Sequence, residues 1–131
     1  MSSYTAQTST DLHESETPSL IAASKVNGTS VYNRNGDSLG SIHDVMINKQ
    51  NGQVSYAVLS FGGFLGIGEK YHPVPWNKLS YSEQHGGYVI DLDKSQLENA
   101  PAYGVSETPD WTTGTYGSSV DRYYGDLPPI R

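Results

Sequence analysis

Short runs of alternating apolar and polar residues, separated by turn signals, dominate the middle of the chain. Asn-Gly pairs at 35–36 and 51–52 and the glycine pair at 86–87 interrupt these runs, at positions where a positive φ angle costs least. The breaks predict six short strands, near residues 29–33, 38–48, 53–61, 70–75, 79–83 and 87–91. Strands of this length and spacing are typical of an all-β meander or a small barrel.

Three of these runs also indicate where a strand lies in the sheet. The run 53–61 is apolar on both faces, which predicts a central strand covered on both sides. In the run 38–48 the apolar spacing slips from two residues to three, which indicates a bulge at His43-Asp44. Pro73 and Pro75 cannot donate to a sheet ladder, so part of their strand is expected at an edge.

One short helix is predicted after the last of these strands, over residues 93–99. Asp93 is suited to the N-cap, and Gln96, three residues later, completes a capping box. Pro101 ends the helix. No other segment is predicted to be helical.

The chain divides into three parts by composition. Residues 1–19 are rich in Ser, Thr and Glu and are expected to form a disordered leader. Residues 20–100 hold the predicted strands and are expected to form the single folded domain, a meander or small barrel. Residues 101–131 form a Gly-rich extended tail whose aromatic side chains are too frequent for a linker. We expect this tail to be ordered only where it docks, with Trp111 or Tyr123 as its main anchor.

Composition and charge narrow the class of protein. The chain of 131 residues has no cysteine, which excludes disulfides, thiolate metal sites and cysteine nucleophiles. Its net charge is −6 and no stretch forms a basic stripe, so nucleic acid is not an expected partner. The sequence has neither a secretory signal nor the roughly 18–20-residue apolar run of a membrane span. We therefore expect a cytoplasmic protein without membrane insertion.

Motifs of catalysis and cofactor binding are missing from the sequence. The glycine-rich stretch 62–68 matches neither G-x-G-x-x-G nor G-K-[ST], and no G-x-S-x-G elbow occurs. The sequence thus predicts a protein that is not an enzyme and that has no cofactor or metal. An alternative is a regulatory protein that binds a small ligand or metal near His43 and His72, because these histidines could meet across strands.

Three separated motifs resemble the PRC-barrel domain family. They are residues 39–48 (LGSIHDVMIN), 51–60 (NGQVSYAVLS) and 62–76 (GGFLGIGEKYHPVPW). In that family a G-x-V-x-D strand and a G-x-V-x-Y strand precede a Gly-rich loop and a Pro-Trp element, in this order. The tail resembles that of stand-alone bacterial members. The resemblance implies a mainly β fold, a small PRC-type barrel like those of the photosynthetic reaction-centre H subunit and RimM.

Those relatives use the barrel as an assembly surface, so the resemblance implies a non-enzymatic interaction module. This chain lacks the membrane helix of the H subunit and the RNA-contacting domain of RimM, so neither specific role carries over. We expect protein contacts through the apolar loop, the Pro-Trp element and the tail, with a homodimer as one outcome. The residues of this interaction surface are Phe64, Leu65, Ile67, Trp76, Trp111, Tyr116, Tyr123 and Tyr124.

Overall fold

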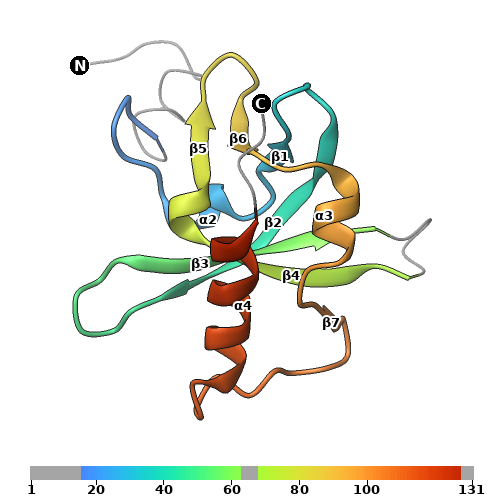
Figure 1. Ribbon diagram of the computed structural model, residues 1–131. Helices are drawn as coiled ribbons and strands as arrows, with labels where there is room; N and C mark the ends of the chain where they lie inside the picture. Colours follow the sequence, from blue (N-terminus) through green and yellow to red (C-terminus); the bar gives the residue numbers. More distant parts are fainter. Residues whose placement is uncertain (1–15, 63–67, 128–131) are drawn as a thin grey trace.

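Seven strands form a single sheet in the order β5-β6-β1-β2-β3-β4-β7 (Figure 1). The computed structural model describes residues 16–62 and 68–127. The strands are β1 (Ser30–Tyr32), β2 (Ser38–Ile47), β3 (Val54–Phe61), β4 (Lys70–Pro75), β5 (Leu79–Ser82), β6 (Gly87–Ile90) and β7 (Tyr103–Gly104). The helices are α2 (Ala23–Val26), the 3-10 helix η1 (Trp76–Lys78), α3 (Lys94–Glu98) and α4 (Thr115–Asp126).

The predicted fold class is confirmed: all six predicted strands are present, and the chain is mainly β. Neighbouring strands are antiparallel, except that β1 and β6 run parallel. Within the described part of the chain, β5 and β7 lie at opposite ends of the strand order and do not pair. The barrel-like sheet is therefore open rather than closed.

Two local predictions about the strands are also confirmed. The register between β2 and β3 shifts between Ile42 and Asp44, which places the bulge at His43. β4 pairs with β7 only at Lys70 and Tyr71. Among the described residues, the later part of β4, which contains both prolines, therefore pairs with β3 on one side and with no strand on the other. This position suits the prolines, because a proline has no N–H to donate to a second neighbouring strand.

The middle strand β3 is covered on both faces, as its apolar pattern predicts. Ala57 and Leu59 are fully buried in the core, and alternation along the strand turns Tyr56 and Val58 to the opposite face. There α4 lies across the sheet (Figure 1), and the Tyr56 hydroxyl donates to Asp121 of α4 at 2.9 Å.

The predicted helix near residue 93 is confirmed as α3. Asp93 accepts a hydrogen bond from the backbone N–H of Gln96, and the Gln96 side chain accepts one from the backbone N–H of Asp93. Because the capping box satisfies two backbone donors that the first turn leaves free, it defines where a helix this short begins.

Residues 115–126 form α4, so the expectation of an extended tail is wrong for this segment. Its stripe of Tyr116, Val120 and Tyr124 has a four-residue spacing that places all three side chains on one helix face. Val120 is fully buried and Tyr124 is 2% exposed. Gly117 fits here because a Cβ would lie 3.3 Å from the Tyr56 hydroxyl. Burial of this stripe outweighs the weak helix propensity of a segment rich in Gly, Ser and Tyr.

Candidate functional site

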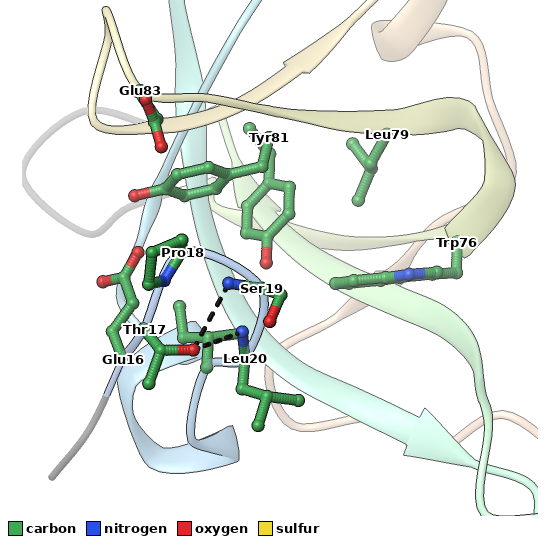
Figure 2. Close-up of a pocket in the computed structure, with 11 residues that line it drawn as sticks. Glu16, Thr17, Pro18, Ser19, Leu20, Trp76, Leu79, Tyr81 and Glu83 are labelled. Atoms are coloured by element: carbon green, nitrogen blue, oxygen red, sulfur yellow. Dashed lines mark hydrogen bonds between the residues drawn. The ribbon is translucent and has the colours of Figure 1, made fainter. Parts of the chain in front are cut away.

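A cavity of about 310 Å³ lies between the β5–β6 hairpin, η1 and the segment that precedes α2 (Figure 2). Tyr81 of β5 and Tyr88 of β6 are cross-strand partners, so their side chains share one face of the hairpin. Trp76, the first residue of η1, and Leu79 of β5 complete this side of the cavity. We call the cavity the aromatic cleft.

A tight turn over residues 16–20 forms the opposite wall of the aromatic cleft (Figure 2). The Thr17 hydroxyl accepts hydrogen bonds from the backbone N–H of Ser19 at 3.3 Å and of Leu20 at 2.9 Å. Glu16 and Ile21 form an isolated antiparallel bridge that joins the two ends of the turn. The sequence assigned residues 16–19 to a leader; here they line the cleft, and the rest of that leader lies outside the described residues.

The three rings of the aromatic cleft meet at steep angles. The centroids of Trp76 and Tyr88 are 5.3 Å apart with ring planes at 61°, and those of Tyr81 and Tyr88 are 5.1 Å apart at 75°. Edge-to-face pairs of this kind add to the stability that burial alone provides. Tyr88 is 5% exposed and Tyr81 is 43% exposed, so the cleft has a fixed ring at its base and an open ring at its rim.

Carboxylates give the aromatic cleft a negative rim. The Glu16 side chain is only 17% exposed, and Glu83 also lines the cavity. Burial raises the pKa of Tyr81 and of Tyr88, and the nearby Glu16 carboxylate raises both further. Lys25 Nζ lies 4.0 Å from Glu16 Oε1, but no basic residue is among the described residues that line the cleft.

The predicted interaction residues fall in three places. Trp76 lies in the aromatic cleft, whereas Phe64, Leu65 and Ile67 lie outside the described residues. The tail aromatics are on or beside α4 and pack against the protein's own sheet and helices. Trp111 and Tyr116 are half-buried, and the Tyr123 hydroxyl donates to the Gln96 carbonyl at 2.6 Å.

The main anchor of the tail differs from the expected Trp111 or Tyr123. Val120 and Tyr124 are the most buried of the described tail residues, at 0% and 2% exposure, and belong to the hydrophobic core. Trp111 instead packs against Tyr56, with ring centroids 5.0 Å apart. Helix formation explains the difference, because it aligns residues four apart and turns them together toward the sheet.

The two histidines considered for a ligand or metal site do not meet. The His43 ring stacks on Tyr71 with centroids 4.1 Å apart, whereas His72 packs edge-on against Phe61 at 5.4 Å. Because Tyr71 and His72 are consecutive in β4, their side chains point to opposite faces of the sheet. The expectation of a joint His43/His72 site is therefore wrong. Among the described residues, no three His, Asp or Glu side chains are grouped to hold a metal.

His72 is a buried histidine without a hydrogen-bond partner for Nδ1 among the described residues. Burial, with a smaller effect of Lys70, lowers its pKa from 6.5 to about 4. The folded protein thus favours the neutral ring. The contribution of the neutral His72 ring to the free energy of unfolding is complete above pH 6.5 and is lost as the pH falls toward 4. A shift of this size corresponds to at most about 3 kcal/mol, and solvent screening reduces it, so we expect a loss of about 2–3 kcal/mol in the free energy of unfolding across this range.

Urea unfolding at pH 7 and pH 4 measures this effect in the wild type and in His72→Phe. The variant, which cannot titrate at this position, should show a clearly smaller loss. The exposed His43 provides the matched control, since His43→Gln should keep the wild-type loss. An equal loss in wild type and His72→Phe would contradict the role of His72.

Sequence reasoning missed Tyr81, Tyr88 and Glu16 as members of the site. A signal for the tyrosines was present, because they lie symmetrically about the turn at 83–86 and therefore pair in the β5–β6 hairpin. Nothing in the sequence places Glu16 beside them, since that contact joins segments about 65 residues apart.

Comparison with known proteins agrees with this architecture. Residues 18–97 match the PRC-barrel domain, and the match includes β1 to β6, the Pro-Trp element and most of the turn that walls the cleft. An uncharacterized protein of Deinococcus radiodurans is 28% identical over 80 residues, which are 61% of this chain and 28% of that protein. In the part of the chain that the structure describes, no helix has the length and apolar character to cross a membrane. The chain belongs to the PRC-barrel domain family.

Proposed function

We propose that this protein is a non-enzymatic interaction module that contacts a protein partner beside the aromatic cleft. The observation that carries the proposal is a set of apolar side chains that line the cleft and are at least partly exposed: Leu20, Trp76 and Tyr81, here called the contact patch. Leu20 is 72% exposed and Tyr81 is 43% exposed. Apolar side chains grouped in this way, with an aromatic anchor in a pocket, are typical of protein contact sites.

The family resemblance supports an assembly role. Barrels of the reaction-centre H subunit and of RimM serve as assembly surfaces, and the Pro-Trp element that resembles theirs supplies Trp76 of the contact patch. The Gly-rich loop with Phe64, Leu65 and Ile67 remains part of the proposed surface. The tail contributes less, since Tyr124 is buried in the core and the other tail aromatics are partly covered.

A second copy of this chain is one partner that the fold can accommodate. β5 borders the contact patch and is the last strand in its direction of the sheet among the described residues. Its outer backbone groups would be available to pair with another strand. A homodimer is therefore included in the proposal, and sedimentation velocity at high micromolar concentration distinguishes it from a contact with a different protein.

Site-specific photocrosslinking tests the proposal. A photoreactive phenylalanine analogue at Leu20 should give a covalent adduct of defined mass in the cells that produce the protein. The same analogue at Val105 is the control and should give none, because Val105 is 54% exposed and follows β7, at the opposite end of the strand order from β5. If position 20 yields no more adduct than position 105, the contact patch is not the site of partner contact.

A further inference from the structure

The aromatic cleft combines two features that suit one class of ligand. Its lining includes the rings of Trp76, Tyr81 and Tyr88 and the carboxylates of Glu16 and Glu83; Figure 2 shows Trp76, Tyr81 and the two glutamates around it. An aromatic ring attracts a cation over its face through its quadrupole, and a nearby carboxylate adds a direct charge attraction. An apolar ligand would use only the rings and would leave the carboxylates without a counterpart.

We propose that the aromatic cleft binds an alkylammonium group, and specifically the side chain of a lysine presented by a protein partner. This inference rests on the proposed function for the source of the lysine. The binding of the ammonium group itself depends only on the cleft.

The arrangement of the rings favours an ammonium group over a guanidinium group. Neighbouring ring planes are turned by 61° and 75°, so the rings form a corner rather than a flat slot. A planar guanidinium stacks best on one extended face, whereas a compact ammonium can contact several rings at once. The volume of about 310 Å³ is at the lower end for ligand pockets and suits a single side chain.

The two carboxylates at the rim of the cleft differ in their ion-pair partners. Glu16 has Lys25 at 4.0 Å, a distance at which the ion pair is weak. No salt bridge involves Glu83 among the described residues. An incoming lysine would meet Glu83 and compete with Lys25 for Glu16. Residues 1–15 contain no Lys or Arg, so the protein's own N-terminal segment has no such side chain to offer.

The two tryptophans provide a direct measurement on the full chain. Trp76 lies in the cleft, and Trp111 packs against Tyr56 on the face covered by α4. In a ¹H–¹⁵N NMR titration, Nα-acetyl-lysine methylamide should shift the Trp76 indole signal and leave that of Trp111 unchanged. We expect a dissociation constant on the order of 1 mM for so small a probe. The Nε-acetylated form, which is neutral, is the matched probe and should not bind.

Four variants test the individual contributions and keep Trp76 as the reporter. Glu83→Gln should weaken binding about fivefold and Tyr81→Leu about threefold. Lys25→Gln should strengthen it about twofold, because it frees Glu16. Glu98→Gln, on α3 and outside the cleft, should leave the affinity unchanged. Because Glu83 and Tyr81 are exposed, their replacement should leave the protein folded. A weaker affinity of these variants can therefore be assigned to the cleft.

The outcomes separate this inference from the proposed function. Equal shifts with the charged and neutral probes, or no shift of Trp76, would overturn the ammonium site even if crosslinking at Leu20 succeeds. If choline binds the cleft and the lysine probe does not, lysine is not the ligand. The control for choline is 3,3-dimethyl-1-butanol, which has the shape of choline but no charge. Selective lysine binding without any adduct at Leu20 would support the site and count against the proposed partner contact.

Discussion

Replacing Tyr124 with alanine should lower the free energy of unfolding by about 3–5 kcal/mol, the usual cost of removing a buried aromatic ring. Tyr124 is 2% exposed and is one of the largest fully buried side chains among the described residues. Through it and Val120, α4 is joined to the hydrophobic core of the barrel. The loss should therefore destabilise the helix together with the sheet face that it covers.

Tyr124→Phe is the matched variant, because it keeps the ring and removes only the hydroxyl. That hydroxyl has no hydrogen-bond partner among the described residues, so its removal should change the unfolding free energy by less than about 1 kcal/mol. Urea unfolding measures both variants. Hydrogen exchange of residues 115–126 should accelerate in Tyr124→Ala and stay slow in Tyr124→Phe. An alanine variant within 1 kcal/mol of wild type would show that α4 is not anchored by this ring.

Replacing Gly40 with alanine should destabilise the fold by about 3 kcal/mol or more. Gly40 in β2 has a φ of 135°, a backbone conformation that residues with a side chain rarely adopt. A Cβ at this position would also overlap the Ser60 carbonyl oxygen of β3. Relief of the overlap would require β2 and β3 to separate where they form the centre of the sheet.

Gly52 supplies the control for the backbone effect alone. Its φ is 77°, but a Cβ there would have nothing within 4 Å. Gly52→Ala should therefore cost about 1 kcal/mol, the cost of the φ angle without a clash. Thermal or urea unfolding compares the two variants, and the excess loss at Gly40 reports the clash together with its less favourable φ of 135°. Equal destabilisation would mean that close strand packing at Gly40 contributes nothing.

The predictions that succeeded depend on signals within a few residues. Asn-Gly turns delimit β2 and β3 because they lower the cost of a hairpin turn wherever they occur. The Asp93–Gln96 capping box identifies the start of α3 for the same reason, since both partners belong to one helical turn. The break in apolar spacing likewise reveals the bulge at His43, because it changes which face each later residue of β2 occupies.

The predictions that failed depend on partners distant in sequence. The segment of α4 has weak helix propensity, and it becomes helical because one of its faces is buried against β3 and β4. The separation of His43 from His72 depends on the registers of three strands, although each histidine was placed on the correct strand. The aromatic cleft escaped prediction because its two walls come from residues 16–21 and 76–88.

The sequence by itself thus determined six of the seven strands, the capped helix, the bulge and the barrel family, because each rests on local backbone preferences or on a motif in fixed order. The tertiary structure alone decided that residues 115–126 of the tail form a helix packed on the sheet and that Glu16 lies beside Tyr81. It also decided that His72 is buried as a neutral ring away from His43. The physical reason is the same in these cases: burial and charge depend on which surfaces meet, and distant segments meet only in the folded chain.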